Sequence, residues 1–229
     1  MTDSPHGNLL ALNCGSSSIK FAVFTHRLER SFSGLVEAIG HGQTPRLKTS
    51  AGDRMEFGGP DQGHAEVLPR LISEIVLPRA GAITGVGHRI VHGGERFKKP
   101  VVIDPDIRAG IAELTPLAPG HQPHNLAGID AARRALPGVP QIACFDTAFH
   151  SGIAAVRREM PLPRSYAKDG LIRYGFHGLS YEHVAANLSG LGFSSGRAIA
   201  CMSQSASTPA ALQTLRITSS REMSSSRDQ

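Results

Sequence analysis

Hydrophobic and polar residues alternate over the opening part of the chain, which is the pattern of short, half-buried strands. Residues 9–13 and 19–24 are two such stretches, and a turn of small polar residues separates them. Three further stretches, at 30–38, 46–51 and 54–57, are bounded by glycines, which favour turns. The pattern therefore predicts a β-meander at the start of the chain.

A helical period replaces this alternation in the next part of the chain. Apolar residues recur three or four positions apart from Ala65 to Val76, and Pro78 then predicts the end of the helix. Residues 82–91 are again mostly apolar and predict another strand. Such a run is typical of a strand that is buried inside a sheet.

A second helix and a short strand follow. Residues 125–136 have the helical period, with Asn125 as the expected N-cap and Pro137 directly after the last turn. Residues 141–145 form a short apolar strand that ends in Asp146. The order β-β-β-α-β-α-β predicts an α/β fold with a mixed sheet.

The character of the chain changes twice after this strand. A looser segment at 157–173 is rich in proline and charge, so we expect a domain to end before it. The predicted domains are an N-terminal domain at 1–147 and the start of an incomplete second domain at 148–202. Residues 203–229 hold eight serines and no aromatic residue, and this composition predicts a disordered tail.

Composition narrows the class of protein. The 229 residues are 40% hydrophobic, which is enough to bury a core, and no stretch approaches the roughly 20 apolar residues of a membrane span. The three widely spaced cysteines fit a reducing compartment, so we expect a cytoplasmic protein without a membrane partner. The net charge of +5 comes from scattered arginines and lysines, which argues against nucleic acid and favours small anionic substrates.

The turn between the first two strands reads NCGSSSIK and is a candidate phosphate loop. Gly15 permits a tight bend, the hydroxyl and backbone N–H groups of residues 16–18 can face an anion, and Lys20 lies on the same strand face as Ser18. A polar hairpin with an exposed lysine is the alternative, and this octapeptide alone favours it.

The stretch GHRIVHGGERF places Arg89 and Val91 on one face of the predicted strand. A guanidinium beside an apolar side chain can hold a carboxylate and contact its alkyl end. The alternative is an arginine in a structural ion pair at the end of a strand. We expect His88 and His92 to pack or to form hydrogen bonds. His88 faces away from Arg89 on the predicted strand, and His92 lies in a glycine turn.

Three later motifs also contain candidate functional residues. LAPGHQPHN carries His121 and His124 in a loop, CFDTAFH carries Asp146 directly after a strand, and YGFHGLSYEHV carries His177. An acid at the end of a strand in an α/β sheet is often a magnesium ligand or a catalytic group. The structural alternatives are a rigid turn, a helix-capping aspartate and a buried histidine.

Taken together and in this order, the five motifs resemble the acetokinase family, the acetate and propionate kinases of the actin-like ATPase superfamily. The resembling blocks cover residues 9 to about 200 of the chain. The resemblance implies an actin-like ATPase (ribonuclease H-like) domain with a mixed sheet, followed by an incomplete second domain. It implies ATP and Mg²⁺ as cofactors, and phosphoryl transfer from ATP to acetate giving acetyl phosphate and ADP, a reversible reaction.

The resemblance assigns the nucleotide side of the site to the first motif. Asn13 would help to bind magnesium, and Ser16, Ser18 and Lys20 would bind the nucleotide phosphates.

The acyl side of the site follows from the same resemblance. Arg89 would hold the acyl carboxylate, and Val91 and Phe176 would line the pocket for the methyl group. Family members form homodimers, and we expect the dimer interface to be incomplete in this chain.

Three further side chains would act on the reacting groups. His121 and His177 would hydrogen-bond the transferring phosphoryl group, and Asp146 would be the active-site carboxylate. A carboxylic acid has a pKa of about 4 and is already ionised at neutral pH, so the nucleophile needs no general base. Our hypothesis is therefore that Asp146 mainly orients Arg89 or the magnesium shell.

The chain departs from the family pattern at several positions. Gly120 stands where the family usually has a bulky apolar residue, and Leu179 and Tyr181 stand where it usually has threonine and histidine. A roomier acyl pocket makes propionate an alternative substrate.

After about residue 200 the resemblance gives way to the serine-rich tail, which predicts a frameshift. The alternative to an active kinase is an inactive remnant or a non-enzymatic binding fragment, because a cleft needs both of its walls.

Overall fold

The structure is a computed structural model that describes residues 7–188, 190, 192, 198–203 and 214–219. Contacts within the backbone divide the chain into two compact units, Met1–Gly178 and Leu179–Gln229. Each unit is described by itself. The domain limits expected from the sequence, after residues 147 and 202, stay predictions.

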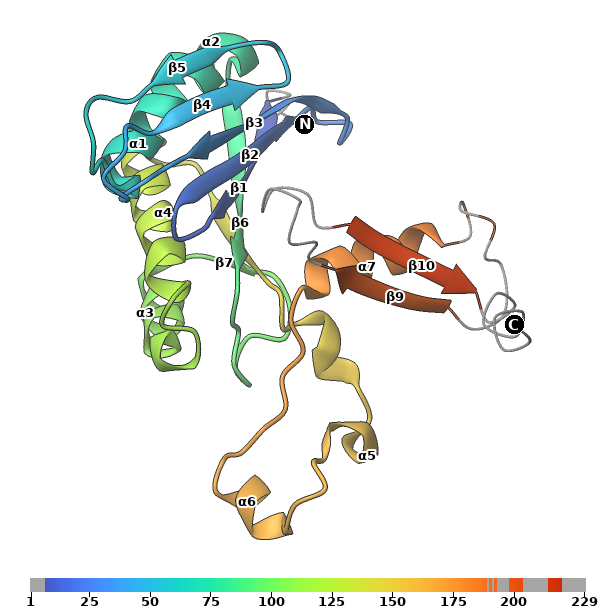
Figure 1. The fold of residues 1–229 in the computed structure, drawn as a ribbon. Coiled ribbons are helices and arrows are strands. Elements are labelled where there is room, and N and C mark those ends of the chain that lie inside the picture. The colour runs from blue at the N-terminus through green and yellow to red at the C-terminus, as the bar shows by residue number, and fades with distance from the viewer. Residues whose placement is uncertain (1–6, 189, 191, 193–197, 204–213, 220–229) are drawn as a thin grey trace, which may run out of the picture. The chain divides into compact units, whose positions relative to one another are not determined.

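The first unit opens with an antiparallel β-meander, as the alternating pattern predicted (Figure 1). Inward-facing positions of these strands are apolar and buried, for example Ile19, Phe21 and Val23. The five strands are β1 (Asn8–Cys14), β2 (Ser18–Phe24), β3 (Arg30–Glu37), β4 (Arg46–Thr49) and β5 (Arg54–Glu56).

Three more strands extend the meander into one mixed sheet. These are β6 (Ile83–Ile90), β7 (Val101–Val102) and β8 (Gln141–Phe145). The strand order is β5-β4-β3-β2-β1-β6-β8-β7. Strands β1, β6 and β8 run parallel to one another, whereas β7 is antiparallel to β8. The predicted α/β fold with a mixed sheet is therefore confirmed.

The first helical segment continues beyond the predicted end. It consists of α1 (His64–Leu71), a π-helical turn η1 (Ile72–Val76) and α2 (Leu77–Ala80). The prediction that Pro78 ends the helix was wrong, because Pro78 lies in the first turn of α2, where the missing backbone N–H costs little.

Two further helices follow β6. Helix α3 (Pro105–Glu113) was not predicted, although Asp104 caps it by accepting a hydrogen bond from the Ile107 N–H at 2.7 Å. A 3₁₀ turn, η2 (Thr115–Leu117), leads to α4 (Gln122–Ala135). The predicted N-cap, Asn125, is not a cap, because α4 begins three residues before it.

Helices α1 and α4 cover one face of the sheet (Figure 1). The β1 side chains that alternate toward this face, Leu10, Leu12 and Cys14, are buried together with Val67 of α1. Residues on the other face of the same strands include Leu9, which is 36% exposed. This second face has an apolar hollow of about 320 Å³, lined mainly by Leu9, Ala11, Phe24, Leu28, Gly85 and Ile142.

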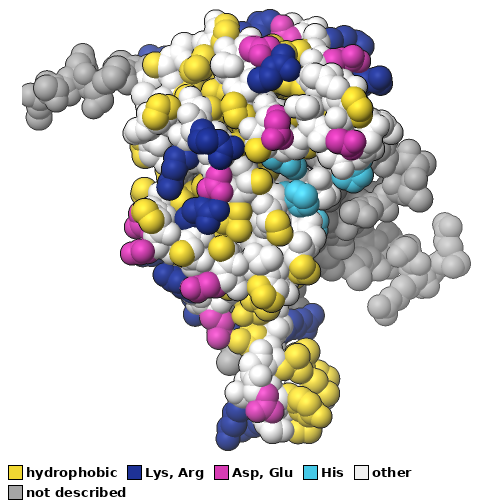
Figure 2. All heavy atoms as spheres, turned by 90° about the vertical axis from the view of Figure 1, so that its left-hand side faces the viewer, with side chains coloured by type: hydrophobic (Ala, Val, Ile, Leu, Met, Phe, Trp, Pro, Cys, Tyr) yellow, Lys and Arg dark blue, Asp and Glu magenta, His cyan; other side chains and the backbone are white. Residues whose placement is uncertain are grey.

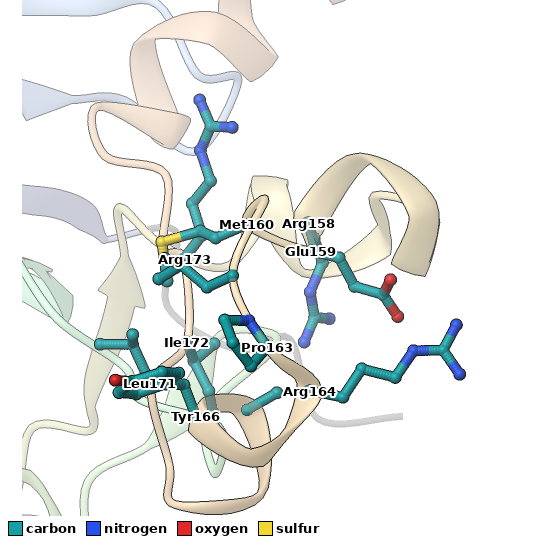
Figure 3. A pocket seen from close by; sticks show the side chains of 11 residues that line it. Arg158, Glu159, Met160, Pro163, Arg164, Tyr166, Leu171, Ile172 and Arg173 are labelled. Carbon is teal, nitrogen blue, oxygen red and sulfur yellow. The ribbon is translucent and has the colours of Figure 1, made fainter.

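Short helices follow β8 in the part of the chain that the sequence marked as loose. They are η3 (Phe149–Gly152), α5 (Ala155–Arg158) and α6 (Arg164–Lys168). A cavity of about 300 Å³ lies within this segment, lined by apolar residues such as Met160 and Leu171 and by three arginines. The Arg164 side chain extends away from the apolar side chains (Figure 3). None of the residues with a predicted functional role lines this cavity.

The described part of the second unit has α7 (Gly178–Asn187) and a two-stranded antiparallel sheet of β9 (Ala198–Ser203) and β10 (Thr214–Ser219). Strand β10 lies within 203–229, where we expected disorder. The remainder of that tail, 204–213 and 220–229, lies outside the described residues. No helix in the described part of the chain is both long enough and apolar enough to cross a membrane.

Candidate active site

Polar side chains from three motifs meet where the parallel strands end. Asn13 is the next-to-last residue of β1, Arg89 is the next-to-last of β6, and Asp146 directly follows β8. The carboxyl ends of parallel strands lie at one edge of a sheet, which is where α/β proteins bind their ligands. The three residues are far apart in the sequence, and the sheet brings them into direct contact.

Arg89 lies between the other two residues. Its Nε donates to both carboxylate oxygens of Asp146 at 3.1 and 3.2 Å, and Nη2 donates to Oδ2 at 2.5 Å. Its Nη1 donates to Oδ1 of Asn13 at 3.1 Å. The Asp146 side chain is only 2% exposed, whereas 29% of the Arg89 side chain remains accessible. A buried carboxylate is therefore paired with a cation that still reaches the surface.

His177 approaches the same carboxylate. Its Nδ1 lies 3.9 Å from Oδ2 of Asp146, and its side chain is 42% exposed. The backbone of His177 has a left-handed φ of 57°, which is uncommon for a residue other than glycine. The neighbours on both sides are held in place: the Gly178 N–H donates to the Asp146 carbonyl at 2.9 Å, and His150 Nε2 donates to the Phe176 carbonyl at 3.0 Å.

The close approach at Gly178 requires a residue without a side chain. A Cβ atom built at Gly178 would lie 2.1 Å from the Asp146 carbonyl oxygen. The segment that carries His177 is thus packed directly on the backbone of Asp146.

The candidate phosphate loop is a tight turn between β1 and β2. The Gly15 N–H donates to the Ser18 carbonyl at 2.8 Å, as expected of a bend at this glycine. Asn13 pairs with Lys20 across the two strands, so their side chains lie on the same face of the sheet. Ser18 and Lys20 are half-buried, and Ser16 is exposed at the tip of the turn.

Sequence reasoning missed His64, which lies beside this loop and pairs with His124. Histidine side chains gather on one side of the face that Figure 2 shows. The His64 ring is 5% exposed and lies 5.4 Å from the His124 ring, measured between centroids. Burial and the proximity of His124 lower the pKa of His64, whereas the backbones of Gly15 and Ser18 act in the opposite direction. His64 is therefore next to the loop, and no motif in the sequence indicated this.

His121 does not join the cluster around Arg89. It directly precedes α4, and its side chain is exposed. No hydrogen bond connects the His121 side chain to Arg89, Asp146 or His177, all of which the structure describes.

The two predicted lining residues of the acyl pocket lie near a buried histidine. Val91 is 8% exposed and Phe176 is 39% exposed. The ring of His92, the residue after Val91, lies 4.5 Å from the Tyr174 ring and 5.5 Å from the Phe176 ring. His92 Nδ1 accepts a hydrogen bond from the Gly94 N–H at 2.9 Å, and burial lowers the pKa of His92. The packing role expected of His92 is confirmed.

His88 is also a buried structural residue, as predicted. Its Nε2 lies 2.8 Å from Oε1 of Gln141, and burial lowers the pKa of His88 to about 4. Gly120, where the sequence departs from the family pattern, borders open space. A Cβ atom built there would meet no other heavy atom within 4 Å.

Known proteins with similar sequences agree with the motifs and with their geometry. The sequence model of the acetokinase family matches residues 8–195. An acetate kinase of Rhizobium meliloti is 43% identical over 189 residues, which cover 79% of this chain and 48% of that protein. One of Synechococcus sp. (strain JA-2-3B'a(2-13)) is 38% identical over 197 residues, covering 78% of this chain and 48% of the relative.

Solved structures give the same result. A propionate kinase from Francisella tularensis subsp. tularensis SCHU S4 superimposes with a TM-score of 0.74 and 31% identity, over 86% of this chain and 52% of that one. The acetate kinase of Porphyromonas gingivalis superimposes with a TM-score of 0.69 and 34% identity, over 81% of this chain and 49% of that one. The expected actin-like ATPase fold is thus confirmed. The chain spans about half the length of these relatives, and it belongs to the acetokinase family.

Proposed function

We propose that this chain carries the nucleotide-phosphate and acyl-binding half of an acetate kinase site, which transfers a phosphoryl group from ATP to acetate. One observation supports this most strongly. The accessible Arg89 guanidinium is fixed between Asp146 and Asn13 at the ligand-binding edge of the sheet, on the face that also carries Lys20. An anion-binding cation next to a candidate phosphate loop is what joining acetate to a triphosphate requires.

Arg89 would bind the carboxylate of the acyl substrate. Acetate is anionic and must approach the negative phosphates of ATP, so positive charge at this point offsets the repulsion. Val91, two residues later, and Phe176 would contact the methyl group. The nucleophile is already ionised at neutral pH, because a carboxylic acid has a pKa of about 4. No residue then needs to remove a proton from acetate.

Asp146 would position Arg89 and would not act as a base. Three hydrogen bonds fix the plane of the guanidinium, and the carboxylate is almost fully buried behind it. This arrangement supports the hypothesis that Asp146 orients Arg89. A fixed cation loses less conformational entropy when it binds a carboxylate than a mobile one does.

The nucleotide phosphates would be held by Ser16, Ser18 and Lys20. Ser16 is exposed at the tip of the turn, Ser18 is half-buried, and Lys20 lies on the same face as Asn13. His177 would donate a hydrogen bond to the transferring phosphoryl group, which fits its exposed side chain near Asp146. The same role for His121 rests on the family resemblance alone.

Magnesium would be held in part by the side-chain oxygen of Asn13. Mg²⁺ usually takes one or two protein oxygens and fills its other positions with water and substrate phosphates. The Asn13 amide oxygen, which has two lone pairs and lies at the ligand-binding edge of the sheet, fits one such position. When bound, the ion would neutralise negative charge on the phosphates.

Propionate is the alternative substrate. The open space at Gly120 and the propionate kinase among the similar structures support a pocket that accepts one more methylene group. We further infer that the protein is located in the cytoplasm. We also infer that full-length members of the family are homodimers.

A second candidate function is binding without turnover. The chain spans about half the length of its relatives, and phosphoryl transfer needs groups on both walls of a cleft. In that case the chain would hold nucleotide or acetate and release them unchanged.

The experiment that separates the two functions is a hydroxamate assay for acetyl phosphate with this chain, ATP, magnesium and acetate. The Arg89→Ala and Lys20→Ala variants serve as controls. Turnover above both controls supports the kinase. Turnover equal to the controls, with ligand binding retained, supports the binding fragment.

A further inference from the structure

Strands β1 and β6 separate at the edge that carries the site. Their parallel pairing ends with Leu12 opposite His88, although β1 continues to Cys14 and β6 to Ile90. Each strand remains paired on its other side, because β1 pairs with β2 as far as Cys14 and β6 pairs with β8 as far as Ile90. The gap therefore opens only between β1 and β6.

Backbone groups that face this gap need other partners, since a buried, unpaired N–H or C=O is costly. The Asn125 side chain supplies a partner to one backbone group on each side of the gap. Its Oδ1 accepts a hydrogen bond from the Val91 N–H at 3.0 Å, and its Nδ2 donates to the Cys14 carbonyl at 2.8 Å. Asn125 is 3% exposed. A side-chain amide thus replaces the peptide group that a continuous ladder would have placed there.

Helix α4 is close enough to β1 to place this side chain. Gly128, one turn after Asn125, lies against Cys14, and a Cβ atom built at Gly128 would lie 2.4 Å from the Cys14 Sγ. The close packing of helix and strand lets a short asparagine reach the backbones of both strands.

The other face of the same gap carries the proposed site. There Nη1 of Arg89 donates to Oδ1 of Asn13, also between β6 and β1. Asn125 on the helix side and the Asn13–Arg89 pair on the open side therefore bridge the same two strand ends. The residues after these ends are the candidate phosphate loop and Val91.

We propose that Asn125 is a positioning residue that sets the spacing between the phosphate loop and the Arg89–Val91 strand end. This inference rests on the proposed function, because the spacing matters to ligands only if both strand ends bind them. Asn125 itself contacts neither ligand. An aspartate would keep the acceptor for Val91 and lose the donor for Cys14, and an alanine would leave both backbone groups unpaired.

The test compares Asn125→Ala and Asn125→Asp with the wild-type chain and with a control variant, Gln141→Ala. Gln141 is also buried on the helix side of the sheet and bonds to His88, but its side chain does not bridge β1 and β6. The control therefore loses a buried hydrogen bond without loss of the bridge. NMR-detected hydrogen exchange at the Arg89 Nη1–H, which donates to Oδ1 of Asn13 across the gap, reports the spacing of the β1 and β6 ends without any ligand.

We expect exchange at the Arg89 Nη1–H to be at least about fivefold faster in Asn125→Ala, and unchanged in Gln141→Ala, at temperatures where both are fully folded. In Asn125→Asp the Val91 amide should stay protected while the Arg89 Nη1–H exchanges faster. Binding of magnesium ATP and of acetate, titrated separately, should both weaken about tenfold in Asn125→Ala, which corresponds to about 1.4 kcal/mol.

Wild-type exchange at the Arg89 Nη1–H in a folded Asn125→Ala variant would overturn the proposal, whatever happens to ligand binding. If Asn125→Ala does not fold, unchanged exchange at the Arg89 Nη1–H in Asn125→Asp overturns it instead. The wild-type chain could also bind neither ligand while exchange at Arg89 is still faster in the Asn125 variants. That result would refute the proposed function and leave the positioning role intact.

Discussion

At the scale of single residues, the Asp146–Arg89 pair can be compared with a second ion pair in the same fold. Arg108 donates to both oxygens of Asp130 at 2.6 and 2.7 Å, but both of those side chains are about one-third exposed. Asp146 is 2% exposed. Similar hydrogen bonds therefore have different energies, because a buried charge that loses its partner is costly and an exposed one is hydrated.

Asp146→Asn should destabilise the chain by about 2 kcal/mol, somewhat less than a fully buried pair because Arg89 is partly accessible. Asp130→Asn, the matched control, should cost less than about 1 kcal/mol. Urea unfolding measures both values.

The orienting role of Asp146 can be tested in a full-length relative. An Asp146→Asn variant of that enzyme that kept most of its turnover and magnesium affinity would contradict the role.

His88 predicts how stability depends on pH. Burial holds its pKa at about 4, below its ordinary value of 6.5. Between these values the unfolded chain binds a proton that the folded chain excludes, so stability falls as the pH falls below about 6.5. At pH 5 the loss from His88 should be about 2 kcal/mol relative to pH 7.5.

Urea unfolding at the two pH values measures this loss. His88→Leu should reduce the pH dependence, whereas His26→Gln, at an exposed position, should retain it. An undiminished pH dependence in His88→Leu would rule out His88 as its source.

Gly120 tests the size of the acyl pocket. A larger side chain fits at this position without a clash, because the space around it is open. In a form that turns over, Gly120→Leu should lower kcat/KM for propionate relative to acetate by about tenfold, since one methylene in a tight pocket is worth about 1–3 kcal/mol. An unchanged ratio of the two kcat/KM values would place Gly120 outside the pocket.

At the scale of elements, the sequence predicted those with a clear period and missed those without one. The meander, β6 and β8 have alternating or continuous apolar patterns, and the structure confirms them. Strand β7 has two residues, too few for any pattern. Helix α3 could have been predicted, because Asp104 followed by Pro105 is a typical helix start.

Asn125 shows why tertiary contacts override local rules. An asparagine before an apolar helical pattern usually caps the helix. Here Pro123 already lies in the first turn, so Asn125 is inside α4 and its amide is used between two distant strands. The sequence indicated Asn13, Arg89, Asp146 and His177 as candidates, and the structure brings these four residues together. The Asn125 bridge and the buried His64 depend on packing that no local pattern records.

The contact between α4 and β1 should tolerate no added methyl group. Gly128→Ala would place its Cβ 2.4 Å from the Cys14 Sγ, and the helix must shift to relieve this. We expect a loss of about 1–3 kcal/mol. Gly152→Ala, where a Cβ meets nothing within 4 Å, should change stability by less than about 0.5 kcal/mol. Equal melting temperatures for the two variants would contradict the close packing.

At the scale of the whole molecule, the mixed sheet presents one edge on which the candidate phosphate loop, the strand that carries Arg89 and the turn that carries Asp146 converge. These parts belong to the first unit, and they occupy the half of the family's length that this chain shares with its relatives. A site built in this way should bind ligands through its own residues, even if turnover needs a further part of the protein.

Titration of the chain with magnesium ATP by calorimetry tests this account most directly, with Lys20→Ala as the control variant. We expect saturable binding with one site per chain, weakened at least about tenfold in Lys20→Ala, which corresponds to about 1.4 kcal/mol. Either no saturable binding to the folded chain, or equal affinity in the wild type and in Lys20→Ala, would contradict the assignment of this turn as a phosphate loop.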